Sequence, residues 1–186
     1  MRVSGEIRVD GQRIGLNNAI AYHDHNWGRW HWGDDAGWEW GAFAFPAIDA
    51  LFVFARASNK AHDRFGLVHF SVELKGCMIA FAPDRVVIEL GGTLGIARRI
   101  PGALAAIHTD RRKLGLPAAV FITANDGTNA VQVVLNAWTA AQLILSEPTQ
   151  PGYSFINEIA GSCTATGKIG DFKFDTSGLG VFEYVE

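Results

Sequence analysis

Short runs of alternating apolar and polar residues, separated by turn-forming residues, cover most of the chain. Residues 3–9 alternate and end at Asp10-Gly11, a pair typical of tight hairpins, and residues 12 to about 27 are expected to return as one long strand. Turn signals recur at the roughly 8–12-residue spacing typical of β-barrels and sandwiches. Further strands are predicted at residues 38–43, 50–56, 65–74, 77–81, 85–90, 117–123, 130–135, 155–167, 172–175 and 180–185.

The pattern leaves some stretches open. Residues 103–108 fit a strand or one short helix, and so do residues 138–145, in which Ala and Leu dominate. A turn is expected at Ser177-Gly178. The chain is therefore predicted to be all-β, an antiparallel barrel of about ten to twelve strands with at most one or two short helices. No repeat or linker divides residues 1–186, so a single domain is expected.

Composition argues for a real core and against several partners. Of 186 residues, 48% are hydrophobic and 19% are charged, which makes intrinsic disorder a poor description. The net charge is −3 and the densest basic cluster, Arg111-Arg112-Lys113, is small, so no nucleic-acid partner is expected. No apolar run approaches the length of a membrane span, and no signal-peptide core is visible, so a cytoplasmic location is expected.

The two cysteines, Cys77 and Cys163, form no Cys-x-x-Cys pair, which argues against a zinc knuckle or a dithiol redox site. One disulfide is compatible with the sequence. Two buried free thiols are the commoner outcome in a chain of this kind.

Residues 21–41 concentrate five of the six tryptophans and three of the six histidines. The indole N–H needs a partner when it is buried, and histidine titrates near neutral pH. Such a stretch suits a pocket that binds an apolar ligand and moves a proton. Its rings are His23, His25, Trp27, Trp30, His31, Trp32, Trp38 and Trp40, together with Tyr22.

Strand alternation allows two arrangements of this stretch. One gathers five side chains around a pocket: His23, His25, Trp27, Trp38 and Trp40. Asp24 then lies behind them and can orient an imidazole or pair with Arg29 or Arg56. The reverse arrangement turns Tyr22, Asp24 and Asn26 inward instead, and alternation alone does not choose between the two.

The sequence contains candidate metal ligands but lacks the standard catalytic motifs. His23-x-His25 can supply two metal ligands, with a third from His31, Glu39, His69 or His108. The glutamate that a cupin places shortly after its second histidine is absent, because Arg29 and Trp30 stand there. No nucleophile elbow or dinucleotide-binding glycine motif is present. We therefore predict no metal site and no cofactor, while a metal-dependent enzyme remains a weaker alternative.

Three motifs occur in order along the chain. They are Ala21-Tyr22-His23-Asp24-His25-Asn26-Trp27-Gly28, Gly37-Trp38-Glu39-Trp40-Gly41, and Gly178-Leu179-Gly180-Val181-Phe182-Glu183-Tyr184-Val185. Together they resemble the lipocalin-like superfamily that includes AttH-type proteins and the carotenoid hydratase (hydroxyneurosporene synthase), with its Asp-x-x-Trp motif, Gly-Trp-x-Trp strand and terminal Gly-x-Gly-x-x-Glu strand. The resemblance implies lipocalin-related barrels, usually two in tandem, that act on terpenoid- or polyketide-like molecules. This chain resembles the half that carries Asp-x-x-Trp, so we expect either a genuine single-barrel member or a missing partner domain. A homodimer could replace the tandem arrangement.

The resemblance also suggests site residues. His25 and Trp27 match the His-Asn-Trp part of the hydratase motif, and Asp24 matches the aspartate of the wider family. The hydratase's later Tyr-x-Asp pair is missing here, where Phe52 and Phe54 stand. The expected catalytic residues are Asp24 and His25. The expected substrate-binding residues are His23, Trp27, Trp38, Trp40, Phe52 and Phe54.

Two functions remain open on this reading. The first is a cofactor-independent lyase or isomerase that hydrates, isomerises or cyclises a hydrophobic terpenoid- or polyketide-like molecule inside a barrel cavity. The alternative is a carrier that binds an apolar ligand without reaction. Loss of the Tyr-x-Asp pair favours the carrier.

Overall fold

The computed structural model describes residues 2–23, 31, 34–95, 97–100, 115–146 and 151–186. These residues form two antiparallel sheets, a two-stranded hairpin and a sheet of ten strands in the order β6-β5-β4-β3-β12-β11-β10-β9-β7, with β8 beside β10. The strands are β1 (Arg2–Val9), β2 (Gln12–Ile20), β3 (Gly37–Phe45), β4 (Ala50–Ser58), β5 (Phe65–Leu74), β6 (Cys77–Phe81), β7 (Val86–Gly91), β8 (Arg98–Arg99), β9 (Ala119–Asn125), β10 (Ala130–Leu145), β11 (Ser154–Ile169) and β12 (Phe172–Val185). Two 3-10 turns, η1 (Pro46–Ile48) and η2 (Pro83–Arg85), are the helical elements of the described chain.

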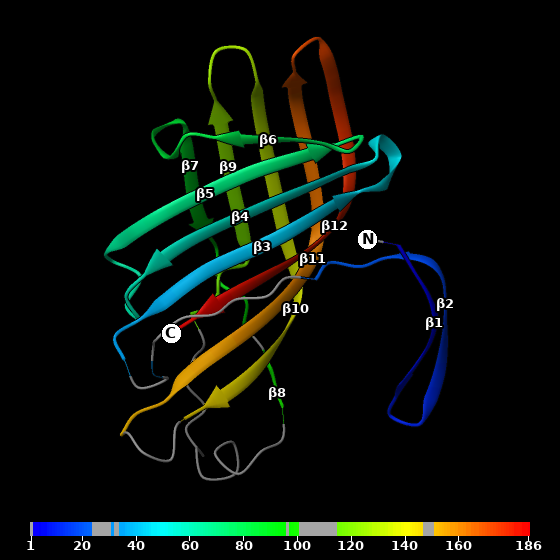
Figure 1. Cartoon of the computed structure of the whole chain (residues 1–186). Coiled ribbons are helices and arrows are strands. Elements are labelled where there is room, and N and C mark those ends of the chain that lie inside the picture. Colours follow the sequence, from blue (N-terminus) through cyan, green and yellow to red (C-terminus); the bar gives the residue numbers. More distant parts are fainter. Residues whose placement is uncertain (1, 24–30, 32–33, 96, 101–114, 147–150) are drawn as a thin grey trace.

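The large sheet curls into a lipocalin-like barrel, as the sequence predicted. Strands β3 to β6 cross in front of β7 and β9 to β12, and the long strands β10, β11 and β12 bend through both layers (Figure 1). Ladder hydrogen bonds do not close the barrel, because β6 and β7 remain its two edges within the described strands. The Arg56 side chain on β4 spans part of this gap, since its Nη1 donates to the Ile88 carbonyl of β7 at 2.9 Å.

Aromatic rings fill the barrel interior. Alternation along β3 turns Glu39, Gly41, Phe43 and Phe45 inward, and all four are buried. The fully buried phenylalanines are Phe43, Phe45, Phe52, Phe54, Phe70 and Phe182. Their rings pack at centroid distances such as 4.8 Å between Phe45 and Phe52, a separation typical of attractive aromatic pairs.

The predicted long strand at residues 12–27 is wrong in its end point, because β2 stops at Ile20. Its partner β1 begins at Arg2, directly opposite Ile20, so β1 offers no pairing beyond that residue. Residues 21–23 lie outside any strand, and residues 24–27 lie outside the described part of the chain.

The predicted turn at Ser177-Gly178 is also wrong, because β12 continues through it. A Cβ on Gly178 would lie 2.0 Å from the Ala44 carbonyl oxygen, and one on Gly180 would lie 2.5 Å from the Phe43 ring. These glycines therefore serve close packing against β3 rather than a turn.

Residues 138–145, which the sequence left open between strand and helix, form a strand. They pair with β11 after a bulge between Ala137 and Thr139. The alternative helix would leave the long β11 strand without its neighbour along this stretch. Residues 103–108 lie outside the described residues. The part of the chain that the structure describes contains no helix with the length and hydrophobicity to cross a membrane.

Both cysteines are free thiols. Cys163 is buried, as expected, but Cys77 at the start of β6 is exposed, so the expectation of two buried thiols is half wrong. Burial raises the pKa of the Cys163 thiol to about 12.

Candidate functional site

The outer face of the sheet, which points away from the core, carries aromatic and acidic side chains side by side. Residues directly opposite each other on antiparallel strands share a face. Trp40, Glu183 and Glu158 lie opposite one another in this way on β3, β12 and β11. The neighbouring row, about 7 Å along the strands, is apolar. It consists of Ala42, Val181 and Ala160.

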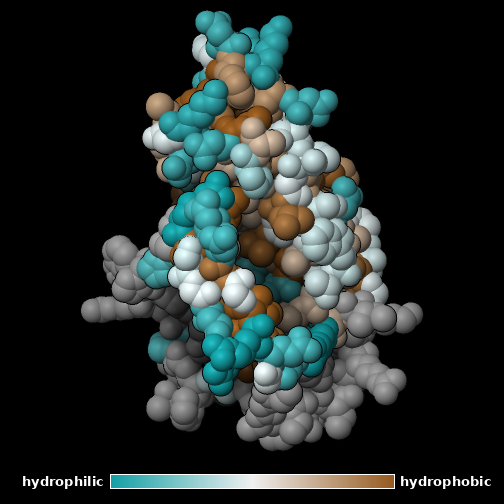
Figure 2. All heavy atoms as spheres, turned by 90° about the vertical axis from the view of Figure 1, so that its right-hand side faces the viewer, coloured by the Kyte–Doolittle hydropathy of each residue, from teal (hydrophilic) through white to brown (hydrophobic). Residues whose placement is uncertain are grey.

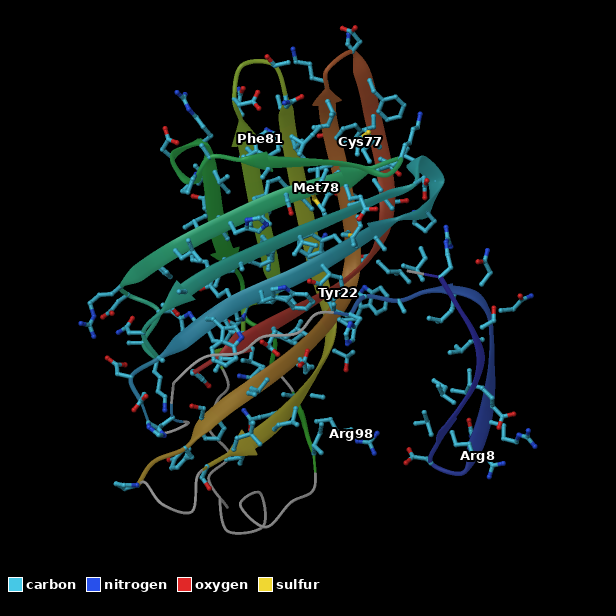
Figure 3. The ribbon with its side chains drawn as sticks, in the orientation of Figure 1. Arg8, Tyr22, Cys77, Met78, Phe81 and Arg98 are labelled. Carbon is cyan, nitrogen blue, oxygen red and sulfur yellow. The ribbon has the colours of Figure 1, made fainter. Side chains whose placement is uncertain are left out.

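A groove of about 740 Å³ opens over the apolar part of this face, and we call it the outer groove. Its lining includes Val181, Ala160, Trp138 and Tyr22. The Tyr22 ring packs on Trp40 with their centroids 4.9 Å apart, and Tyr22 lies where the chain leaves the hairpin and reaches the barrel (Figure 3). The size and the mainly apolar lining of the outer groove are typical of a small-molecule site.

Glu158 and Glu183 form a hydrogen-bonded carboxyl pair one row away from the groove lining. Burial, then the negative charge of Glu183 and the hydrogen bond to it, raises the pKa of Glu158 to about 7. Trp38 donates its indole N–H to Oε1 of Glu183. Glu158 keeps part of its surface exposed, so water reaches the pair.

The carboxyl pair and the aromatic rings near it are suited to acid–base chemistry. A carboxyl group that holds its proton near neutral pH is suited to general acid catalysis, and an ionised neighbour can accept a proton. The rings of Trp40 and Tyr22 beside the pair present π faces that stabilise positive charge.

The inner face of β3 carries a second polar cluster, centred on the fully buried Glu39, which we call the inner cluster. Arg56 contacts Glu39 Oε2 through Nε at 2.8 Å and through Nη2 at 2.6 Å. Nδ1 of His62 lies 2.9 Å from Glu39 Oε1, and Ser58 Oγ lies 3.1 Å from the same nitrogen. A buried carboxylate is tolerated when its charge is offset and its oxygens accept hydrogen bonds, as they are here.

His62 reaches this cluster from the turn between β4 and β5. Its Nε2 lies 2.9 Å from the Val185 carbonyl oxygen, and its ring stacks on Tyr184 at 3.9 Å. Both ring nitrogens of His62 therefore lie within hydrogen-bond distance of protein oxygens, so the ring is held from both sides. Burial, followed by the charges of Glu186 and Glu39, raises the pKa of Tyr184 to about 12, which keeps its phenol neutral.

We interpret the inner cluster as a structural fastening. Among the described residues, every buried side-chain nitrogen and oxygen has a hydrogen-bond partner, so the cluster presents no group free to meet a ligand. Glu39 and Arg56 also connect β3 and β4 to β7 across the open seam of the barrel. Arg56, one predicted partner of Asp24, is thus engaged with Glu39.

The residues predicted for the site divide between the two faces. Trp38 and Trp40 lie on the outer face beside the carboxyl pair. Phe52 and Phe54 are fully buried in the core, away from the outer groove. His23 is exposed. The remaining predicted site residues lie outside the described part of the chain: Asp24, His25 and Trp27.

The groove is on the outside of the barrel, whereas the sequence placed the ligand inside. The physical reason is the interior packing, because phenylalanine rings occupy the space between the two layers at Phe52 and Phe54. The small outward side chains Ala42 and Ala160 leave room on the opposite face instead.

Within the described residues, no three His, Cys, Asp or Glu side chains are placed to hold a metal ion. Of the candidate third ligands, Glu39 is occupied by Arg56 and His62. His69 contacts Ser71 instead, with its Nε2 3.0 Å from the hydroxyl oxygen.

The sequence did not single out Glu158 and Glu183 as candidate site residues. Glu183 is the final glutamate of the Gly-x-Gly-x-x-Glu motif, and that motif entered the sequence analysis only as support for the family resemblance. Glu158 has no local signal, because it is one acidic residue on a long strand. Its position opposite Glu183 depends on the register between β11 and β12.

Comparison with known proteins supports the fold. No family model and no curated protein matches the chain. A solved structure from Nitrosomonas europaea, assigned as an AttH, aligns with a TM-score of 0.57 and 17% identity over 98% of this chain and 48% of that chain. Kievitone hydratase from Nectria haematococca aligns with a TM-score of 0.55 and 13% identity over 98% of this chain and 49% of that chain.

The chain therefore has the fold of AttH-like, lipocalin-type proteins, and the resemblance predicted from its motifs is confirmed at the level of the fold. It spans about half the length of each of these two proteins.

Proposed function

We propose that this chain is a hydratase-like enzyme that binds a hydrophobic small molecule in the outer groove and uses Glu158 and Glu183 for proton transfer. The observation that carries the proposal is the hydrogen-bonded carboxyl pair beside an apolar groove. The shared fold with a kievitone hydratase supports hydration as the reaction class. The substrate class that fits is an alkene of terpenoid or polyketide type, because the groove offers mostly apolar and aromatic contacts.

The proposed reaction needs no cofactor. Protonated Glu158 transfers its proton to one alkene carbon, so a C–H bond forms, the π bond breaks and the other carbon becomes cationic. The faces of Trp40 and Tyr22 stabilise this charge. Water then forms the C–O bond, and its released proton returns to the carboxyl pair. Loss of a neighbouring proton instead gives isomerisation, and attack by a second double bond gives cyclisation.

Asp24 and His25 remain part of the proposal as further proton-transfer residues, with His23 and Trp27 as substrate contacts. The support is the path of the chain, which reaches this segment immediately after Tyr22, a groove residue in contact with Trp40.

The test is turnover of a panel of terpenoid alkenes and prenylated phenols in heavy water, with products identified by mass spectrometry. The wild-type protein is expected to add one heavy water across a double bond. Glu158→Gln should lower the rate at least about 100-fold, the usual contribution of a general acid. Glu89→Gln, an exposed glutamate on β7, is the matched control and should keep the wild-type rate. Folded Glu158→Gln and Glu183→Gln variants with the wild-type rate would refute the assignment.

A carrier function is the second candidate, because the mainly apolar lining of the outer groove would bind a ligand without the carboxyl pair. The groove-filling variant Ala160→Trp and the variant Glu158→Gln together distinguish a carrier from an enzyme. A carrier loses ligand binding in Ala160→Trp, keeps it in Glu158→Gln, and returns the ligand unchanged after long incubation. An enzyme keeps binding in Glu158→Gln but loses turnover.

A further inference from the structure

A smaller pocket of about 290 Å³ adjoins the outer groove, and we call it the end pocket. Figure 2 looks at the side of the molecule from which the β1–β2 hairpin projects and shows a hollow with hydrophobic residues around it in the middle of that face. Four residues line both the outer groove and the end pocket, namely Ile20, Ala44, Pro46 and Leu51. The two cavities therefore share a wall, and one elongated molecule can occupy both.

The end pocket differs from the outer groove in its charge. Its lining includes Arg2 of β1, Asp49 in the turn before β4, and Glu73 of β5. Among the described residues, no Asp, Glu, Lys or Arg side chain lines the outer groove. The joined cavities are thus apolar at one end and charged at the other.

The register of the sheet places this change of character on one row of outward-facing residues. Leu179, Ala44, Leu51 and Glu73 lie opposite one another in turn on β12, β3, β4 and β5. The first three line the outer groove, and Glu73, which is partly buried, lines the end pocket. Glu73 therefore stands where the apolar row ends.

The charged groups of the end pocket do not neutralise one another. Neither the Asp49 nor the Glu73 carboxylate forms an ion pair or a hydrogen bond with another described residue. Arg2 pairs with neither carboxylate, and its Nη1 instead donates to the Asn18 carbonyl oxygen at 3.4 Å. The Asp49 backbone is held in place, because the Lys75 N–H donates to its carbonyl oxygen at 2.9 Å. Two carboxylates and a guanidinium thus remain available to a ligand.

This set of groups favours one kind of ligand head. A carboxylate only accepts hydrogen bonds, and a guanidinium only donates them. A cationic head would be repelled by Arg2, and an anionic head would be repelled by both Asp49 and Glu73. A neutral hydroxyl group both donates and accepts, so it satisfies the carboxylates and the guanidinium together.

We propose that the end pocket binds the hydroxyl head of an amphipathic substrate whose hydrocarbon tail lies in the outer groove. β5 is three strands away from β12 in the sheet, and Glu183 lies four residues along β12 from Leu179. At about 4.8 Å between strands and about 3.4 Å per residue, the end pocket is about 20 Å from the carboxyl pair. A hydroxyl group and a reacting alkene this far apart define a long-chain isoprenoid alcohol as the substrate class. The inference rests on the outer groove as the binding site of the proposed function, and it does not depend on proton transfer by the carboxyl pair.

The test compares four ligands that share one tail and differ in the head: geranylgeraniol, its methyl ether, geranylgeranylamine and geranylgeranoic acid. Each is titrated into the intact chain below its micelle concentration, and binding is followed by tryptophan fluorescence, since Trp138 lines the groove and is exposed. The alcohol should bind about 10-fold more tightly than the methyl ether, which lacks the O–H donor to a charged acceptor. The alcohol should also bind more tightly than the amine and the acid.

Variants of the end pocket locate the preference. Glu73→Leu should weaken binding of the alcohol about 10-fold and leave binding of the methyl ether unchanged. Asp49→Asn should also reduce the preference, and it keeps the backbone, because Asn readily adopts the positive φ of 52° found here. Glu89→Leu is the matched control, at an exposed position of β7 outside both cavities, and should keep the wild-type preference. Far-UV circular dichroism verifies that each variant keeps its strand content.

Equal binding of all four ligands would overturn the end pocket as a head site and leave the outer groove intact. Tightest binding of the amine would show a cation site, and tightest binding of the acid would show an anion site at Arg2; either result would overturn the hydroxyl assignment. An alcohol preference that persists in both Glu73→Leu and Asp49→Asn would do the same. Absence of binding by every ligand would overturn the outer groove as well. The expected preference without turnover of any ligand would support the end pocket and count against the proposed enzyme alone.

Discussion

Glu158 and Glu183 lie opposite one another on β11 and β12, and their carboxyl groups share a hydrogen bond on the outer face of the barrel. The residues that flank Glu183 point the other way. Phe182 is buried in the core, and Tyr184 stacks on His62 in the inner cluster. Alternate residues of β12 thus pack into the interior and supply Glu183 to the carboxyl pair, which means the two roles can be tested separately.

The carboxyl pair should make stability fall as pH rises. The folded-state pKa of Glu158, about 7, lies above its ordinary value of 4.5. Its favourable contribution is therefore complete below pH 4.5 and is lost as pH rises through about 7. Glu158→Gln should unfold like wild type at acidic pH and be more stable above neutral pH. A difference on the order of 1 kcal/mol is expected, because Glu158 is partly exposed and solvent screens the pair.

Thermal unfolding of wild type and Glu158→Gln, at one pH below 4.5 and at one pH above 7, measures this difference. Glu89→Gln serves again as the control, and its melting temperature should match that of wild type at both pH values. Equal melting temperatures of wild type and Glu158→Gln at both pH values would mean that the pair does not hold a proton.

Breaking the inner cluster should be costly. Arg56→Met leaves the fully buried Glu39 with His62 alone and removes the link to the Ile88 carbonyl of β7. We expect a loss of about 3–5 kcal/mol in the free energy of unfolding, measured by urea denaturation. The double variant Glu39→Leu/Arg56→Met should lose less than Arg56→Met, since no buried carboxylate remains. A loss below about 1 kcal/mol for Arg56→Met would place the cluster among ordinary surface ion pairs.

The two kinds of strand glycine should respond differently to a methyl group. Gly178→Ala pushes a Cβ against the Ala44 carbonyl and should destabilise the protein by about 1–3 kcal/mol. Gly15→Ala meets no atom within 4 Å and should be neutral or slightly stabilising. Chemical denaturation of both variants checks the difference, and a neutral Gly178→Ala would argue against the close contact of β12 with β3.

The two thiols should differ in reactivity with Ellman's reagent. In the native protein we expect one thiol to react, because Cys77 is exposed and Cys163 is buried with a pKa raised to about 12. Cys77→Ser should leave no fast-reacting thiol, and both cysteines of the wild type should react in denaturant. Fast modification of native Cys77→Ser would show that the core around Cys163 opens.

Local patterns predicted the strands well where their pairing partner is a neighbour in sequence. The Asp10-Gly11 hairpin is an example, because its turn and its alternation agree. The end of β2 and the continuity of β12 were not predictable, because they depend on the pairing register and on the packing of Gly178 against Ala44. For the candidate site, Trp38 and Trp40 were identified from their density in the sequence, and the structure brings them to the carboxyl pair.

By itself, the sequence determined the all-β class, the lipocalin-like resemblance and which residues of each strand share a face. Each of these follows from short-range periodicity and motif spacing, which need no knowledge of partners. Only the tertiary structure decided which face is the inside, that phenylalanines fill the interior, and that Glu158 meets Glu183 beside an outer groove. The reason is that strand register and barrel curvature join residues far apart in the chain, and alternation is unchanged when the two faces are exchanged.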